Sequence, residues 1–165
     1  MSNAQKRLLK EFKKYSNPNN KLSESIISLT PINDNNLFDW IAIINPIETI
    51  YKKGFYKLSI KLSNTYPLTP PIIKFITNES QIDRDEQITY QIPHCNIDFK
   101  TGEICLDILK IDNWSPIWTL EYSILAIIYL LNNQEPNSPL NIDFANLIKL
   151  NDKLAINSII NYYIK

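Results

Sequence analysis

A run of apolar residues that begins at position 120 constrains the fold of this 165-residue chain more than any other feature. Leu120, Ile124, Ile127, Ile128 and Leu131 recur at helical spacing, and apolar residues occupy nearly every face of the segment. A surface helix would keep a polar face, so this segment predicts a helix buried at the centre of the molecule. The whole chain, residues 1–165, suits one domain, and a domain of this size buries roughly 70% of its unfolded surface.

Short runs with the composition of β-strands precede the central helix. They fall at 26–29, 38–44, 55–62 and 72–77, and Pro, Asn and Gly residues separate them at short intervals. Consecutive strands with short links imply a four-stranded antiparallel meander.

Helices are also predicted at both ends of the chain. The first, at 4–15, has an apolar side formed by Leu8, Leu9, Phe12 and Tyr15 and a basic side formed by Lys6, Arg7, Lys10, Lys13 and Lys14. Two shorter helices are predicted at 144–150 and 154–163, after Pro136 and Pro139 end the central helix. Helices and strands that are segregated in this order favour an α+β domain, with helices on one face or at the ends of an antiparallel sheet.

The composition excludes several classes of function. The 17 basic and 17 acidic residues give a net charge of zero, so no global field attracts nucleic acid or an anionic membrane, and the expected partners are proteins. The N-terminus has no secretory apolar region, and no stretch approaches the roughly 18 apolar residues of a membrane span. We therefore expect an intracellular protein without direct membrane insertion. The chain has two cysteines, which we expect to be free thiols rather than a disulfide framework. With one histidine in addition, the chain has too few ligands for a structural zinc site, so no metal is expected.

The stretch IPHCNIDFKTGEICLDIL, residues 92–109, holds the candidate chemistry: His94, Cys95, Asn96 and Cys105. A reactive cysteine needs partial exposure and stabilisation of its thiolate. Each cysteine can equally be a small buried apolar residue, the histidine a core residue with satisfied hydrogen bonds, and the asparagine an ordinary turn residue. A Cys-His hydrolase built from Cys105 and His94 also remains open, although the chain offers no second histidine and no orienting acid at a telling position.

Seven blocks of the sequence occur in the order and at nearly the spacing found in ubiquitin-conjugating enzymes, which the chain resembles over almost its whole length. The blocks are KRLLKEF, LFDWIAIINP, IYKKGFYKLSIKL, YPLTPP, TGEICLDIL, WSPIWTL and EPNSPLN. In that family a His-Pro-Asn triplet precedes the catalytic cysteine, and here the triplet is His94-Cys95-Asn96. This triplet, one extra residue before Cys105, and the SPL sequence near the end resemble the peroxisomal members of the family, the fungal peroxin type.

The resemblance implies a role for each residue of the site. Cys105 would accept ubiquitin as a thioester from an activating enzyme, which alone uses ATP, so this chain needs no cofactor. Asn96 would either donate to the developing oxyanion or brace the loop. His94 would hold the loop rather than act as a base, with Asp107 and Ser138 also supporting the site. Ser138 stands where many members have an Asp that helps an incoming lysine.

The resemblance also implies surfaces for partners. Lys6, Arg7 and Lys10 match the helix that is presented to the activating enzyme and to ligases. Two loops match the docking site of a RING-type ligase, through Leu68, where the family often has Phe, and through Ser115, Pro116 and Ile117. Loop 78–92 is longer than usual, and we interpret it as a solvated excursion or a species-specific contact surface.

The implied function is ubiquitin transfer to a peroxisomal import receptor by a cytoplasmic enzyme. A membrane-anchored peroxin would recruit the enzyme to the cytosolic face of the peroxisomal membrane. Two other functions remain open: a general cytosolic ubiquitin-conjugating enzyme, and a catalytically silent relative that only binds ubiquitin or a ligase.

Overall fold

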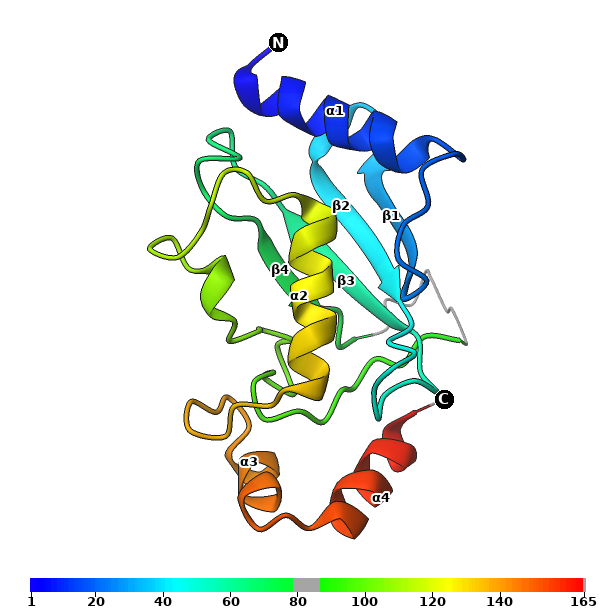
Figure 1. Ribbon diagram of the computed structural model, residues 1–165, viewed down its shortest axis with the longest axis vertical. Helices are drawn as coiled ribbons and strands as arrows, with labels where there is room; N and C mark the ends of the chain where they lie inside the picture. Colours follow the sequence, from blue (N-terminus) through cyan, green and yellow to red (C-terminus); the bar gives the residue numbers. More distant parts are fainter. Residues whose placement is uncertain (79–86, 165) are drawn as a thin grey trace.

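In the part of the chain that the structure describes, the fold consists of four α-helices, a short 3-10 helix and a four-stranded sheet (Figure 1). The computed structural model describes residues 1–78 and 87–164. In chain order the elements are α1 (Asn3–Ser16), β1 (Ile26–Asn33), β2 (Asn36–Ile44), β3 (Tyr56–Lys61), β4 (Ile72–Phe75), the short 3-10 helix η1 (Asp107–Leu109), α2 (Leu120–Asn132), α3 (Ile142–Lys149) and α4 (Lys153–Tyr163).

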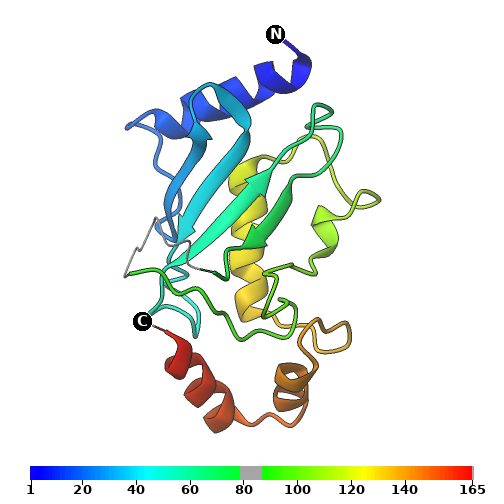
Figure 2. The same cartoon turned by 180° about the vertical axis from the view of Figure 1, so that it is seen from behind.

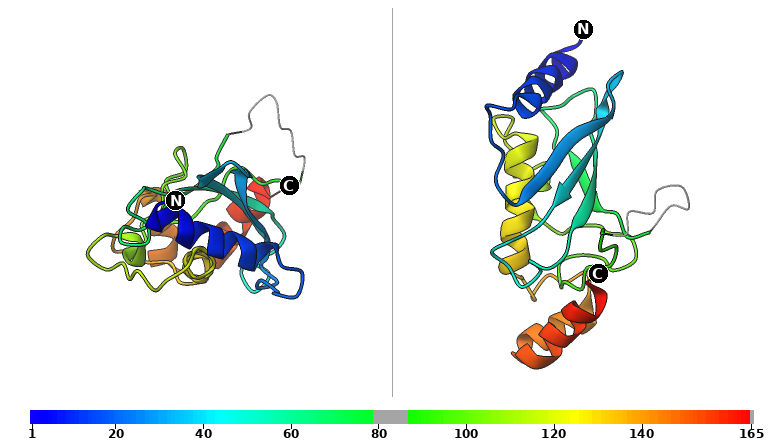
Figure 3. Two further views of the ribbon diagram at one scale, coloured as in Figure 1. Left: turned by 90° about the horizontal axis from the view of Figure 1, so that it is seen from above. Right: turned by 90° about the vertical axis from the view of Figure 1, so that its right-hand side faces the viewer.

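The sheet is an antiparallel meander with the strand order β1-β2-β3-β4, and α2 packs across one of its faces (Figures 2 and 3). The side chains of Leu120, Ile124, Ile127 and Leu131 in α2 are fully buried, and so is Trp40 of β2. The predicted α+β architecture and its meander are therefore confirmed. Helix α2 is buried on the side that packs on the sheet, but Tyr122, Leu125 and Tyr129 on its other side are exposed, because α2 forms the outer layer over that face (Figure 3).

The two ends of the molecule are covered by different helices. Helix α1 lies across one end of the sheet, and α3 and α4 lie at the opposite end (Figure 1). The chain between β4 and α2 passes the C-terminal end of α2, where His94 is hydrogen-bonded to the carbonyl of Leu130. This arrangement separates α1 from the loop that carries the two cysteines.

Three details differ from the expectations. Strand β1 runs through Pro31 to Asn33, which is possible because β1 is an edge strand and an edge proline breaks no ladder on its open side. Helix α3 begins at Ile142, because the side chain of Asn141 caps it by accepting the N–H of Phe144. In α1, Arg7 does not stand free on the expected basic side, because its side chain turns inward to bond Glu11.

Of the long loop predicted at 78–92, residues 79–86 lie outside the described residues. Among the helices of residues 1–78 and 87–164, none is both long and apolar enough to cross a membrane.

Candidate active site and docking surfaces

A tight turn delivers the chain to Cys105. The Asp98 carboxylate accepts the N–H groups of Lys100 at 2.9 Å and Thr101 at 2.8 Å, and these bonds lower its pKa. Gly102 closes the turn with φ of 72°, and a Cβ at this position would lie 1.9 Å from the carbonyl oxygen of Phe75. Only glycine fits here, because the backbone is left-handed and the end of β4 is in contact.

The two cysteines lie in different environments. Cys105 is half-buried, and its N–H donates to the carbonyl oxygen of Asn96 at 2.9 Å, so the triplet and the thiol-bearing residue are directly paired. Cys95 is fully buried, and burial raises the pKa of its thiol to about 11. Only Cys105 therefore combines access with the position expected of a nucleophile.

The side chain of Asn96 is engaged on both of its polar atoms. Its Nδ2 donates to the carbonyl oxygens of Glu135 at 2.8 Å and Ser138 at 3.3 Å. Its Oδ1 accepts the N–H of Glu135 at 2.8 Å and the thiol of Cys95 at 3.2 Å. In this structure Asn96 thus joins the triplet to residues 135–138 and acts as a brace.

His94 is fully buried and neutral. Its Nδ1 accepts the N–H of Asn96 at 3.0 Å, so its proton is on Nε2, which donates to the carbonyl oxygen of Leu130 at 3.0 Å. Burial lowers the pKa of the imidazole to about 4. Because both ring nitrogens are engaged and the ring stays neutral near pH 7, this geometry is that of a structural histidine.

Cys95 also contributes a hydrogen bond that a proline could not make. Its N–H donates to Oε1 of Gln134 at 3.0 Å, and Nε2 of Gln134 donates to the hydroxyl of Tyr51 at 3.3 Å. The Tyr51 hydroxyl in turn donates to the carbonyl oxygen of Pro93 at 2.6 Å. The cysteine in the triplet is therefore matched by a glutamine at 134, a partner that could not be identified from the sequence.

The two other predicted site residues are exposed. Asp107 begins η1 and pairs with Lys110, which raises the pKa of that ammonium group. Ser138 contributes its backbone carbonyl to Asn96, as described above, and its side chain faces solvent.

The predicted ligase-docking loops lie side by side. Leu68 is 70% exposed and Ile117 is 80% exposed, so both apolar side chains are accessible to a partner. The indole N–H of Trp114 donates to the carbonyl oxygen of Pro67 at 2.7 Å and so ties the two loops together. Of the remaining residues in the second loop, Ser115 is half-buried and Pro116 is exposed.

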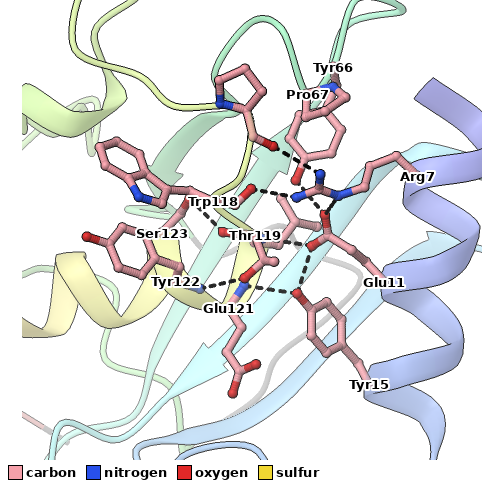
Figure 4. Close-up of polar contacts among 12 residues, drawn as sticks. Arg7, Glu11, Tyr15, Tyr66, Pro67, Trp118, Thr119, Glu121, Tyr122 and Ser123 are labelled. Atoms are coloured by element: carbon pink, nitrogen blue, oxygen red, sulfur yellow. Dashed lines mark hydrogen bonds and ion pairs between the residues drawn. The ribbon is translucent and has the colours of Figure 1, made fainter. Parts of the chain in front are cut away.

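A buried carboxylate lies behind these loops, at Glu11 of α1 (Figure 4). Its Oε1 accepts Nε of Arg7 at 2.8 Å and the hydroxyl of Tyr66 at 2.6 Å. Its Oε2 accepts the hydroxyl of Tyr15 at 2.7 Å and the N–H of Leu120, the first residue of α2, at 2.8 Å. We call these five residues the Glu11 cluster.

The sequence contained a signal for this cluster that our prediction missed. Glu11 falls at the same helical spacing as Ala4, Leu8 and Tyr15, so it lies on the stripe of α1 that faces inward. A carboxylate on such a stripe needs buried donors. Of the three basic residues predicted to meet partners, Lys6 and Lys10 are exposed, whereas Arg7 belongs to the cluster.

In residues 1–78 and 87–164, no group of three or more His, Cys, Asp and Glu side chains is arranged to hold a metal ion.

Comparison with known proteins gives matches along almost the entire chain. The model of the ubiquitin-conjugating enzyme family matches residues 7–163. The chain is 42% identical to the ubiquitin-conjugating enzyme E2-21 kDa of Pichia angusta over 99% of this chain and 94% of the relative. It is 40% identical to the protein PEROXIN-4 of Arabidopsis thaliana over 99% of this chain and 94% of the relative.

Solved structures agree with this assignment. The crystal structure of the H. polymorpha ubiquitin-conjugating enzyme Pex4p, in complex with the soluble domain of Pex22p, superposes with a TM-score of 0.87. The two chains are 40% identical, and the match covers 99% of this chain and 97% of that one. A ubiquitin-conjugating enzyme from Plasmodium yoelii superposes with a TM-score of 0.78 at 34% identity, over 99% of this chain and 94% of the other.

Proposed function

Because this chain belongs to the ubiquitin-conjugating enzyme family and is similar to its peroxisomal members, we propose that Cys105 carries ubiquitin and transfers it to a peroxisomal import receptor. The observation that carries this proposal is the contrast between the cysteines: Cys105 is accessible and paired with Asn96, whereas Cys95 is sealed in the core.

The chemistry is two successive acyl transfers. In loading, the Cys105 thiolate attacks the carbonyl carbon of the ubiquitin C-terminus, and the activating enzyme's thiol leaves. In discharge, a nucleophile of the acceptor attacks the same carbon, the C–S bond breaks, and the Cys105 thiolate is regenerated. Neither step consumes ATP on this chain, so we propose that it works without a cofactor.

The loop around Cys105 supplies positioning. Asn96 pairs with Cys105 through its backbone and with residues 135–138 through its side chain, so it fixes the position of these backbone segments beside the thiol. Because they are already in place, the protein does not have to rearrange when charge develops on the carbonyl oxygen. For Asn96 to donate to that oxyanion, Nδ2 would have to exchange one of its two carbonyl partners, and the longer bond, to Ser138, is the one that we expect to open.

We further propose that the acceptor of ubiquitin is a cysteine thiol rather than a lysine. Ser138 faces solvent at the place where many family members have an Asp. A lysine amine, with a reference pKa of about 10.4, needs help to lose its proton, whereas a thiol near 8.5 needs less.

Partners are proposed for two surfaces. The exposed Lys6 and Lys10 of α1 would meet the activating enzyme and ligases, and the exposed Leu68 and Ile117, with Ser115 and Pro116, would dock a RING-type ligase. Leucine at 68 presents less apolar area than the phenylalanine common in the family, which would influence the choice of ligase.

A membrane-anchored peroxin is proposed to recruit the chain to the cytosolic face of the peroxisome. The support is that a relative 40% identical to this chain was crystallised with the soluble domain of Pex22p. The competing function, a general cytosolic ubiquitin-conjugating enzyme, shares the catalysis but not this recruitment, so the protein recovered with the chain from its own cells distinguishes the two.

One assay tests the catalytic proposal. The chain is incubated with ubiquitin, activating enzyme and ATP, and an adduct that a reducing thiol releases is expected. Absence of an adduct would indicate a silent binding module. Hydrolysis of an activated ester without ubiquitin would indicate the Cys-His hydrolase. Either result contradicts the proposal.

A further inference from the structure

The proposed ligase-docking surface comes from three separate segments: α1, the loop that contains Leu68, and the loop that contains Ile117. A partner that contacts all three requires them to be held at fixed relative positions. The Glu11 cluster contacts each of these segments beneath the surface: Glu11 itself is buried, and Arg7 is half-buried.

Tyr66 connects Glu11 to the first loop. This tyrosine lies two residues before Leu68, its ring is buried, and its hydroxyl donates to Glu11 at 2.6 Å. The Arg7 guanidinium lies over the same ring, with its central carbon 5.7 Å from the ring centroid. The base of the Leu68 loop is thereby attached to α1 at one point.

Arg7 connects Glu11 to the second loop (Figure 4). While its Nε bonds the carboxylate, its two terminal nitrogens donate to the carbonyl oxygens of Pro116 at 3.0 Å and Trp118 at 2.7 Å. These carbonyls flank Ile117, so one planar guanidinium fixes the backbone on both sides of that exposed side chain.

We propose that Glu11, Arg7 and Tyr66 are positioning residues for ligase docking, which set where Leu68 and Ile117 lie relative to α1. This inference rests on the proposed function, because it requires those two side chains to meet a ligase. It assigns to Arg7 an action through the loop backbone rather than direct contact with a partner.

The chain offers a matched control in its other tyrosine on the same carboxylate. Tyr15 donates to Glu11 at 2.7 Å and accepts the N–H of Glu121 at 3.2 Å, and its other polar neighbour is Thr119, the N-cap of α2. It therefore joins α1 to the start of α2 rather than to the backbone that flanks Leu68 or Ile117. Tyr66→Phe and Tyr15→Phe each remove one hydroxyl group that donates a hydrogen bond to the same buried carboxylate. A role in stability alone would make the two variants alike, whereas positioning makes them differ.

The test titrates loaded enzyme with the purified RING domain of a peroxisomal ubiquitin ligase and measures discharge onto free cysteine. Each rate is divided by that variant's own rate without the RING domain. We expect Tyr66→Phe to raise the half-maximal RING concentration about fivefold, the equivalent of one hydrogen bond, and Tyr15→Phe to change it less than about twofold. The maximal rate at saturating RING domain should remain within about twofold for both.

Arg7→Lys provides a second variant, which retains the charge beside Glu11. A lysine ammonium cannot bond the carboxylate and both carbonyl oxygens at once, as the planar guanidinium of arginine does. This variant should therefore raise the half-maximal RING concentration, as Tyr66→Phe does. The inference is overturned if Tyr66→Phe and Tyr15→Phe shift the half-maximal concentration equally, or if neither shifts it.

Leu68→Ala and Ile117→Ala separate this inference from the proposed function. If these variants also leave the half-maximal concentration unchanged, the proposed docking surface is wrong. If they raise it while Tyr66→Phe and Arg7→Lys do not, the surface stands and only the positioning role is rejected.

Discussion

Two ends of the molecule differ in their buried polar groups. At the end around Cys105, which we call the catalytic end after its proposed function, the buried polar side chains are neutral. At the end around α1 and the Leu68 and Ile117 loops, which we call the docking end, the buried polar centre is the Glu11 carboxylate. His94 carries no charge near pH 7, and Asn96 bonds backbone groups and the neutral Cys95 thiol. Glu11 instead faces Arg7 and two phenols. Both ends fix loops that come from distant parts of the sequence.

The difference is understandable from the task of each end. A fixed charge buried beside Cys105 would alter the stability of the thiolate, so a neutral brace positions the loop without changing the nucleophile. The docking end performs no chemistry, and there a charge with several donors holds three segments strongly. The catalytic brace should therefore respond to changes in hydrogen bonding, and the docking cluster to changes in charge.

The largest effect on stability is expected from Glu11→Gln, which removes the buried negative charge and leaves the Arg7 guanidinium without its partner carboxylate. We expect the free energy of unfolding to fall by about 3 kcal/mol, measured by urea denaturation. The control is Glu103→Gln, which breaks an exposed pair with Lys74 at 2.9 Å and should cost less than about 1 kcal/mol. Equal losses in the two variants would mean that burial of the charge is not what distinguishes the docking end.

At the catalytic end, Asn96→Ala is expected to slow discharge about 10²-fold, because the developing oxyanion loses the donor that Nδ2 offers once its bond to Ser138 opens. Loading should change less, since the activating enzyme supplies its own site. The three bonds lost to Glu135 and Ser138 should also lower the free energy of unfolding by about 2–3 kcal/mol. Single-turnover loading and discharge onto free lysine measure the two steps separately, and normal discharge would contradict the assignment.

Acidification should lower the free energy of unfolding through His94, which is neutral and buried at the catalytic end. Its pKa of about 4 in the folded chain lies below the ordinary 6.5, so the unfolded chain binds a proton that the folded chain rejects between these values. Stability from this residue is complete above 6.5 and declines as the pH falls, by roughly 1.3 kcal/mol between pH 7.5 and 5.5.

The measurement is urea denaturation at both pH values, for the natural chain and for His94→Gln, in which position 94 cannot titrate. The natural chain should lose more stability on acidification than the variant. Identical losses would show that His94 is not a buried neutral group.

The smallest effect is expected from Ser138→Asp, which adds a carboxylate to the neutral end. Discharge onto free lysine should increase relative to free cysteine by about tenfold or less, below the roughly 10²- to 10⁴-fold of a positioned general base, because a carboxylate at this exposed position is solvated. Both acceptors are compared near neutral pH for the natural chain and the variant. An unchanged ratio would remove this position as the determinant of acceptor preference.

Much of the fold could be predicted from local patterns. Apolar residues on nearly every face placed α2 in the core, and alternating runs with short links gave the meander, because both features depend on sequence periodicity. The predicted first strand ends at residue 29, before Pro31, whereas β1 continues to Asn33, since the pattern alone does not show that the strand lies at an edge. Edge position is set by which strands pair, and pairing is a tertiary property.

The candidate site divides in the same way. The triplet and Cys105 were found because they are close in sequence and match a family motif. The partners that hold them were not found: Gln134 lies 39 residues from Cys95, and Tyr66 lies 55 residues from Glu11. Neither pair has a spacing that links it, so only the folded chain could bring them together.

The most direct test of the central claim is to determine which residue carries ubiquitin. Cys105→Ser and Cys95→Ser are loaded with ubiquitin, activating enzyme and ATP, and the adducts are mapped by peptide mass spectrometry. We predict an oxyester on residue 105 of Cys105→Ser that resists a reducing thiol, and a normal thiol-sensitive adduct on Cys105 of Cys95→Ser. A thiol-sensitive adduct in Cys105→Ser, or loading that persists in Cys105→Ala, would contradict the account.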